Sequence, residues 1–333
     1  MKPFMLSRPH GAFGSTTTTG LSEKSFSGAH DEVRFLLKAL PAALLSVGLL
    51  MAAPSLAADA AAPSKPQTQS EASKAVQPQV DKQAADAAAE KRKKLLADAT
   101  AAIAQTQQAL KALEDKKNDE ALKALADATG KLELIVARDP TLKLAPLSTG
   151  VITYDLLATP DTVKVAIAEA RKALNDGAIP HARLLVEALA SETQIRTTNI
   201  PLGTYPAAIK AITPLIDAGR IDEAKTQLQA ALSTLVTTTD VIPLPKLRAE
   251  NLLKDAQALT EKKVRSKEEN DKLTSDLKAA REQLQMAELL GYGREPDYQP
   301  MYAQLDGIEK ASAGGKSGTG WFEKIKKQLS DVF

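Results

Sequence analysis

The chain has 333 residues, of which 43 are basic and 41 acidic, and it contains no cysteine. The missing cysteine excludes disulfides, cysteine nucleophiles and thiolate metal sites. The near-neutral charge argues against a basic surface for nucleic acid.

The N-terminal part of the chain has the pattern of a secretory signal peptide. A basic segment precedes an apolar run at residues 39–51, and Ser55 and Ala57 supply the small side chains that the signal peptidase accepts. The apolar run is too short to span a bilayer. We therefore predict that residues 1–57 form an N-terminal extension and signal peptide, with cleavage between Ala57 and Ala58 and export of the mature chain to the periplasm.

Removal of the leader changes what chemistry remains. Residues 1–57 contain five of the basic and three of the acidic residues, so 38 of each remain, and His181 is the single histidine left. Serine and cysteine triads need an imidazole base, and zinc sites need several His or Cys ligands. We therefore expect no enzyme, no catalytic residue, no metal site and no cofactor, and we set nucleic acid aside as a partner.

Composition divides the mature chain into four segments. Residues 58–80 are rich in Ala, Pro, Ser, Gln and Lys, which predicts a flexible linker. Residues 81–312 are dominated by Ala and Leu at helical spacing, which predicts a helical-hairpin domain. Residues 313–320 form a Gly-rich linker, and residues 321–333 form an amphipathic tail.

We expect an all-α fold of stacked antiparallel helical hairpins with short extended Pro-containing straps. Gly177 and Gly219 are typical of helix ends in the left-handed conformation, and Pro180 is typical of a helix start. The predicted helices cover residues 81–115, 118–137, 161–176, 180–195, 205–218, 221–237, 246–263, 267–290 and 298–312.

An internal repeat supports this expectation. Sliding the chain by 42 residues aligns the segment 166–202 with the segment 208–244, including Gly177 on Gly219 and an Ile-Pro-Leu sequence at the end of each unit. A more diverged hairpin of the same kind covers 109–125, where Lys116 takes the position of Gly177. Each unit is thus predicted to be a helical hairpin that ends in an extended strap, since proline favours extended backbone.

The segment 149–159 alternates apolar and polar residues. It is compatible with a short strand that pairs with the extended pieces around 198–202 and 238–244, and equally with packed irregular loops.

Two segments resemble the YfdX family. The residues that carry the resemblance are Val241-Ile242-Pro243-Leu244-Pro245, Arg248-Ala249, Ala280, Gln283-Leu284, Ala287-Glu288 and Leu289-Leu290-Gly291-Tyr292-Gly293. The resemblance covers roughly residues 90–300. It implies an all-helical, periplasmic, oligomeric protein linked to acid or heat tolerance, with chaperone-like or small-molecule-binding behaviour and no catalytic motif. Its signature residues for structure or interaction are Pro243, Leu244, Pro245, Arg248, Leu290, Gly291, Tyr292 and Gly293.

The tyrosines are candidates for a ligand pocket between helices. They are Tyr154, Tyr205, Tyr292, Tyr298 and Tyr302. The alternative is that they cap a core while the hydroxyl stays in water, as tyrosines at turns often do.

The tail is a second candidate for interaction. As a helix it places Trp321, Ile325, Leu329 and Val332 on one face, with Phe322 and Phe333 beside it and lysines at the rim. Such a helix can dock on its own chain, join a neighbouring subunit, or contact an anionic membrane surface.

The function expected from these patterns is non-enzymatic. We predict a homo-oligomeric periplasmic stress-tolerance protein that binds unfolded client proteins on apolar surface between hairpins. The alternatives are a periplasmic module that binds a small ligand, and an envelope scaffold that acts through the tail.

Overall fold

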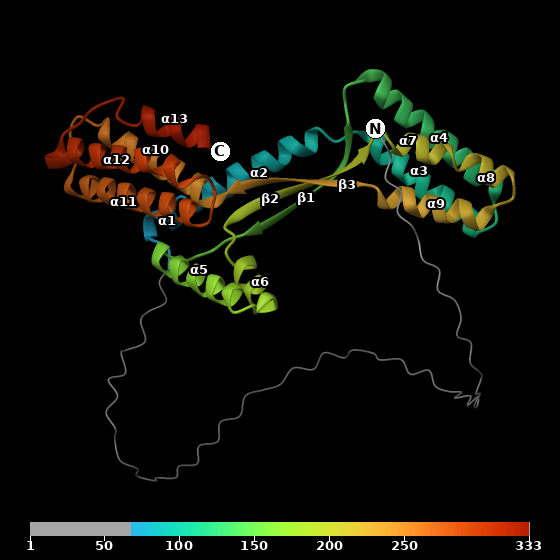
Figure 1. Cartoon of the computed structure of the whole chain (residues 1–333). Helices are drawn as coiled ribbons and strands as arrows, with labels where there is room; N and C mark the ends of the chain where they lie inside the picture. Colours follow the sequence, from blue (N-terminus) through green and yellow to red (C-terminus); the bar gives the residue numbers. More distant parts are fainter. Residues whose placement is uncertain (1–67, 333) are drawn as a thin grey trace, which may run out of the picture. The chain divides into compact units, whose positions relative to one another are not determined.

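The computed structural model describes residues 68–332 (Figure 1). Most of these residues are helical, and three strands form one antiparallel sheet. The helical fold class is therefore confirmed in outline, and the open choice between strands and irregular loops is decided in favour of strands. The predicted signal peptide, with Ala57 and Ala58, lies outside the described residues.

Three consecutive units share one plan, in which a helical hairpin is followed by a strand. They are α3 (Ala97–Glu114), α4 (Asn118–Arg138) and β1 (Leu144–Tyr154), then α5 (Pro160–Asn175), α6 (Ile179–Glu187) and β2 (Glu192–Pro201), then α7 (Tyr205–Lys210), α8 (Thr213–Asp217), α9 (Ile221–Ser233) and β3 (Val236–Pro243). The last two units follow the 42-residue repeat. The predicted Ile-Pro-Leu straps are the ends of strands, since Pro201 closes β2 and Pro243 closes β3.

The turn of each hairpin contains a residue whose backbone is in the left-handed conformation. Gly177 has φ of 71° and Gly219 has φ of 72°, while Lys116 at 60° is the one non-glycine residue with positive φ in the described part of the chain. A side chain is unfavourable in this conformation, which is why glycine occupies it in two of the three units.

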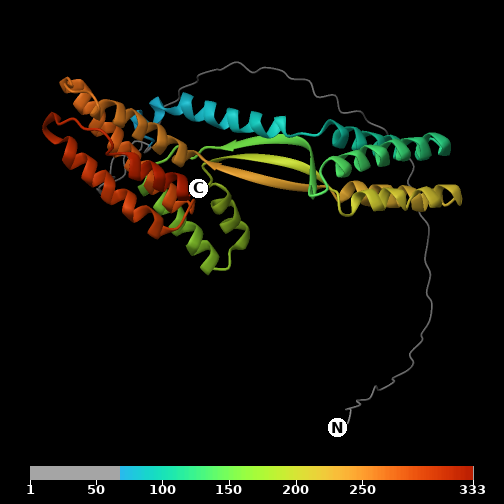
Figure 2. The ribbon, with the colours of Figure 1, turned by 90° about the horizontal axis from the view of Figure 1, so that it is seen from above.

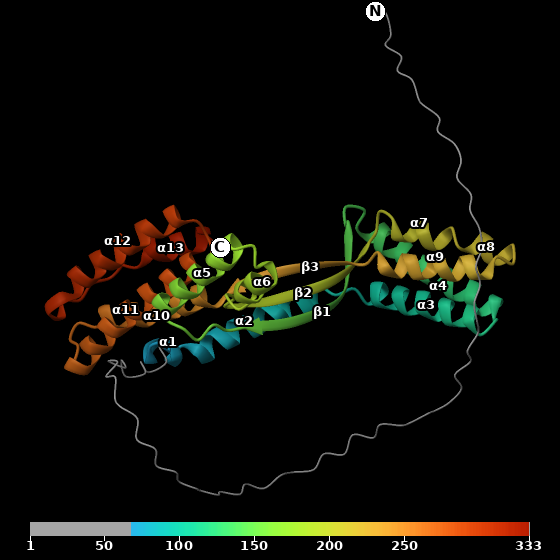
Figure 3. The ribbon, with the colours of Figure 1, turned by 60° about the horizontal axis from the view of Figure 1, so that its bottom comes forward.

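The sheet determines where the hairpins lie. Its strand order is β1-β2-β3, with both pairs antiparallel, so Thr197 of β2 is paired with Thr149 of β1 and Thr238 of β3. Antiparallel strands leave the sheet at alternate ends. The first and third hairpins therefore lie at one end and pack on each other, while α5 of the second hairpin contacts α11 at the other end (Figure 3). The hairpins are not stacked in a single row, which corrects the predicted arrangement.

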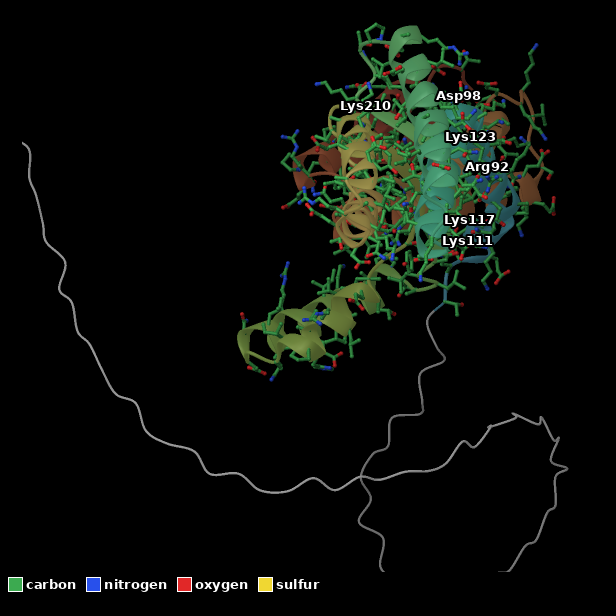
Figure 4. All side chains as sticks on the ribbon, turned by 90° about the vertical axis from the view of Figure 1, so that its right-hand side faces the viewer. Arg92, Asp98, Lys111, Lys117, Lys123 and Lys210 are labelled. Atoms are coloured by element: carbon green, nitrogen blue, oxygen red, sulfur yellow. The ribbon has the colours of Figure 1, made fainter. Side chains whose placement is uncertain are left out.

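The first and third hairpins enclose a core built largely from small side chains. Alanines on α3 and α4 allow the helices to approach closely, and Leu132, Ile209 and Leu228 fill the remaining space. Charged side chains of this bundle, among them Lys111, Lys123 and Lys210, lie on its exposed surface (Figure 4).

A further correction concerns the predicted linker at 58–80. Its last part forms α1 (Glu71–Ala75) and the start of α2 (Gln77–Lys93), and Val76 and Val80 are buried. Helix α2 contacts β1 and β2 (Figure 2). The chain then leaves the helical conformation at Leu96, so the single helix predicted at 81–115 is two helices.

Other helix boundaries also differ from the predictions. The helices expected to reach 195 and 237 end earlier because Thr-rich, β-branched segments enter the sheet at Glu192 and Val236. The helix expected at 205–218 is divided, and Pro214 lies in the first turn of its second part.

The remaining helices form a second core. They are α10 (Leu244–Thr260), α11 (Lys267–Leu289), α12 (Glu295–Ser312) and α13 (Glu323–Val332), with the short 3₁₀ turn η1 (Ala313–Gly315) before the last. Ser266 and Glu269 cap α11 reciprocally. Leu252, Leu277 and Leu305 are among the fully buried residues of this core.

Candidate functional site

The two signature segments meet at the start of β2. The backbone N–H of Leu244 donates to the carbonyl of Ser191 at 2.9 Å, and the N–H of Ser191 donates to the Tyr292 hydroxyl at 3.0 Å. That hydroxyl in turn donates to Glu192 Oε2 at 2.7 Å. A shallow cavity of about 320 Å³ lies between the segments and is lined by residues that include Pro243, Tyr292 and Gly293. The strand therefore brings together segments that are almost 50 residues apart in the chain.

Arg248 lies fully buried beside this junction. Its Nη2 donates to Asp155 Oδ2 at 2.6 Å, and Nε and Nη2 donate to Gln77 Oε1 at 3.0 and 2.7 Å. Asp155 follows β1, and its second oxygen accepts from Ser191 Oγ at 3.4 Å. Arg248 thus connects α10 with α2 and the end of β1, as a buried cation bound by the partly exposed side chains of Gln77 and Asp155.

The other signature residues shape the same junction. Leu244 and Pro245 are buried in the first turn of α10, and Leu290 packs beside the small cluster around Met286. Gly291 has φ of 80° and Gly293 has φ of 116°, which allows the chain to reverse after α11.

The five tyrosines do not form one pocket. Tyr205 is buried in the core of the first and third hairpins, and Tyr154 is 39% exposed at the end of β1. The others lie together: the rings of Tyr298 and Tyr302 stack with centroids 6.5 Å apart, and the Tyr298 hydroxyl donates to the carbonyl of Tyr292.

The hydroxyls of this tyrosine cluster remain protonated. Burial, followed by the hydrogen bond to Glu288, raises the pKa of Tyr302 well above its usual range, and the Tyr302 hydroxyl donates to Glu288 Oε2 at 2.5 Å. Burial likewise raises the pKa of Tyr292 and Tyr298. The cluster is therefore a set of hydrogen-bond donors already engaged by the protein, as expected for tyrosines that cap a core.

The tail is docked on its own chain. Phe322, Ile325 and Leu329 are buried in the second core, and Gln328 accepts from Gln304 of α12 at 2.6 Å. In the described structure the tail therefore takes the first of the three alternatives, docking on its own chain. Phe333 lies outside the described residues.

The Gly-rich segment before the tail is also held in place. Nη2 of Arg265 donates to the carbonyl of Lys316 at 2.8 Å, and Gly318 donates its N–H to the carbonyl of Thr260 at 3.0 Å. Arg265 is itself buried. The predicted flexible linker at 313–320 is therefore an anchored turn.

The second hairpin carries an apolar surface that sequence patterns alone did not single out. Val165 is 69% exposed, Leu184 is 65% exposed, and the neighbouring Leu157 is 60% exposed. Further exposed apolar side chains on the hairpin are Leu174, Ile179 and Val186. We call this set the α5–α6 surface. The repeat could have indicated this surface. The first and third hairpins bury apolar faces against each other, which leaves the second hairpin without an equivalent partner among residues 68–332.

One face of the sheet also exposes apolar side chains. Ile152, Tyr154 and Val241 are each more than a third exposed, and the strand register places Ile152 and Val241 on either side of Gln194. Residues paired directly across a sheet point to the same side. On the opposite side, β2 buries Thr193, Ile195, Thr197 and Asn199.

His181 is exposed at the start of α6. Within residues 68–332, no cluster of His, Asp and Glu has the arrangement of a metal site, and no helix is long and apolar enough to cross a membrane.

Comparison with known families identifies the three-unit region. Residues 102–241, from within α3 to within β3, match the model of the YfdX protein family. The chain contains a YfdX domain. The match covers the three hairpin-strand units and ends before Pro243, so the two segments that carried the resemblance lie beyond it.

The chain is also similar to solved structures. The YfdX protein of Salmonella Typhi aligns at 14% identity, with 45% of this chain and 93% of that chain covered and a TM-score of 0.31. The search of curated proteins finds no match to this chain.

Proposed function

We propose that this YfdX-domain protein is a non-enzymatic stress-tolerance protein of the periplasm that binds unfolded clients on the α5–α6 surface. The observation that carries the proposal is the exposure of six large apolar side chains in one segment of about 30 residues. Exposed large apolar side chains at this density are typical of interaction sites in soluble proteins. Acid or heat stress is the proposed setting, as the family resemblance implies.

The open face of the sheet extends the proposed client surface. Its strands are rich in threonine and contain three charged residues, Glu192, Arg196 and Asp240. An extended apolar segment of a client contributes about 1.5–3 kcal/mol for each large side chain that it buries. Several such contacts suffice to compete with aggregation.

Aggregation of a thermolabile enzyme tests the proposal. The chain beginning at Ala58 is added at equal molar ratio, and light scattering is recorded on heating and, separately, at acidic pH. We expect suppression by the native chain and loss of more than half of it in the double variant Val165→Thr and Leu184→Gln. Val264→Thr is the matched control, because Val264 is 86% exposed between α10 and α11.

Two results would count against client binding. One is the absence of suppression by the native chain. The other is equal suppression by the double variant and by the control.

We also propose that copies of the chain associate through the α5–α6 surface when no client is present. The first and third hairpins bury their apolar faces against each other, and the second hairpin has no equivalent partner within the described part of the chain. A second copy of α5–α6 offers a matching face in a two-fold interface. Light scattering coupled to size exclusion should show a smaller assembly for the double variant than for Val264→Thr.

Export remains part of the proposal on the strength of the leader pattern. N-terminal sequencing of the protein purified from its host should begin at Ala58. A first residue upstream of Ala52 would contradict cleavage of this leader.

A further inference from the structure

A groove of about 580 Å³ opens at the junction of α2 and α3, away from the α5–α6 surface. It lies over the buried side of the sheet, and its volume falls in the range of small-ligand sites. The apolar wall comes from the α2–α3 junction, α4 and β1. Its residues are Leu95, Leu96, Ile135, Leu142, Leu144 and Pro146.

The rim of the groove is charged, and most of these charges are already paired. Lys91 Nζ lies 2.7 Å from Asp240 Oδ2, and Arg138 Nη1 lies 2.7 Å from Asp98 Oδ2. The Asp139 carboxylate accepts from the backbone N–H and the hydroxyl of Thr141.

Lys94 is the exception at this rim. It lines the groove, it is exposed, and no ion pair engages its ammonium group in the described structure. Asp98, which is labelled on α3 in Figure 4, also lines the groove.

One polar group inside the groove has no partner. Thr197 is 8% exposed, and its hydroxyl makes no hydrogen bond within the described structure. An unmade hydrogen bond of a buried hydroxyl is unfavourable, and native proteins seldom retain one without a use. Its neighbour Asn199 is different, since Nδ2 donates to the carbonyls of Thr197 and Val236.

The first turn of α3 adds further donors. Leu96 precedes the helix in an extended conformation and provides no side-chain cap. The amide groups of Ala97 and Asp98 therefore have no partner within the helix, and both residues line the groove. The N-terminus of a helix of 18 residues favours a negative group.

We propose that this groove binds an amphipathic carboxylate. The hydrocarbon part lies on the leucine wall, the carboxylate is held by the Lys94 ammonium group and the first amides of α3, and the Thr197 hydroxyl donates to a carboxylate oxygen. Asp98 and Asp240 at the rim are already paired with Arg138 and Lys91, so they attract a cation with the same hydrocarbon chain less strongly than free carboxylates would. Lys94 therefore decides the preferred sign of charge.

Three ligands of equal chain length test the preference. Decanoate, decanol and decyltrimethylammonium are titrated by calorimetry, below their micelle-forming concentrations, into the chain beginning at Ala58. We expect saturable binding of decanoate that is about tenfold tighter than that of decanol, equivalent to about 1.4 kcal/mol, and weaker binding of the cation.

Two variants locate the site. Lys94→Gln should weaken decanoate about tenfold and leave decanol unchanged, and Thr197→Val, which keeps the side-chain shape, should weaken decanoate several-fold. The controls are Lys93→Gln, whose ammonium group pairs with Glu90, and Thr237→Val on the exposed side of β3. Circular dichroism verifies that each variant folds.

The proposal is overturned if the three ligands bind alike, if decanoate does not saturate the protein, or if neither Lys94→Gln nor Thr197→Val changes the affinity for decanoate. Client binding does not depend on this groove, so suppression of aggregation by the variants is a separate measurement.

Discussion

The first and third hairpins differ from the second in what becomes of their apolar faces. All three are built to the same plan, yet α3, α4 and α7–α9 enclose a common core while α5–α6 leaves Leu174 and Val186 in solvent, although their repeat equivalents Ile216 and Leu228 are buried. The strands explain the difference, because an antiparallel sheet sends alternate hairpins to opposite ends. A repeat with an odd number of units thus keeps one hairpin without an equivalent partner, and interaction surface arises without any special motif.

The strongest test concerns how the sheet is anchored at the end that carries the second hairpin. Arg248→Met should lower the free energy of unfolding by about 2–5 kcal/mol, because three hydrogen bonds from a charged group to Asp155 and Gln77 are lost. Urea denaturation followed by circular dichroism measures the loss. Lys254→Met, at an exposed position of the same helix, is the control and should change stability little.

The next test compares the two kinds of hairpin directly. Leu228→Ala in the shared core should cost about 2–5 kcal/mol, since it leaves a cavity. At a protein concentration low enough to dissociate the copies, Leu184→Ala on the α5–α6 surface should change stability by no more than about 0.5 kcal/mol. Equal losses in urea denaturation would mean that the second hairpin is buried in the protein as it exists in solution, as it would be within a tight assembly.

The hairpin turns allow a smaller, reciprocal test. Lys116→Gly should stabilise the first hairpin by about 1 kcal/mol, because Lys116 has a left-handed backbone, and Gly177→Ala should destabilise the second by a similar amount. An added Cβ at Gly177 meets no neighbouring atom within 4 Å, so the cost is one of backbone conformation alone. Melting temperatures that move in the same direction for both variants would contradict this reading.

The smallest expected effect depends on pH and concerns the second core, which buries a carboxylate. Burial raises the pKa of Asp276, although the Lys272 ammonium group at 2.6 Å opposes the shift. Between the ordinary value of 3.8 and the raised value, the folded protein binds more protons than the unfolded chain, so this group adds stability as the pH falls. Asp276→Asn should therefore gain stability relative to the native chain at neutral pH.

That gain should shrink towards pH 3, where the native carboxyl group is itself protonated in both states. Urea midpoints of the two proteins at a series of pH values measure the trend. A difference that grows on acidification would show that the ion pair with Lys272 outweighs burial.

Helices and turns were the predictable part of this fold. Alanine-rich segments with Gly177 or Gly219 at their ends carry strong local preferences, and the 42-residue repeat added long-range support. The strands were harder, because β2 buries Thr193, Thr197 and Asn199 on the side where a pattern of hydrophobicity would need apolar residues. Helix α2 was missed in part for a related reason: one valine and two alanines make its buried face.

The candidate sites could be predicted only in pieces. The signature residues around Pro243 and Tyr292 were found, but their meeting point depends on Ser191, which no local pattern distinguishes. The α5–α6 surface follows from the topology of the sheet, and the groove beside Lys94 follows from a break between two helices. Neither is a property of a local segment.

The docking of the tail has a practical consequence. Trp321 is the only tryptophan in the chain, and its indole ring lies against Gly318, where an added Cβ would come within 2.2 Å of the ring. The intrinsic tryptophan fluorescence of the protein therefore reports only on the surroundings of Trp321, and no added label is needed. A red shift of that emission would follow release of the C-terminal helix in real time, under the same heat or acid that exposes clients.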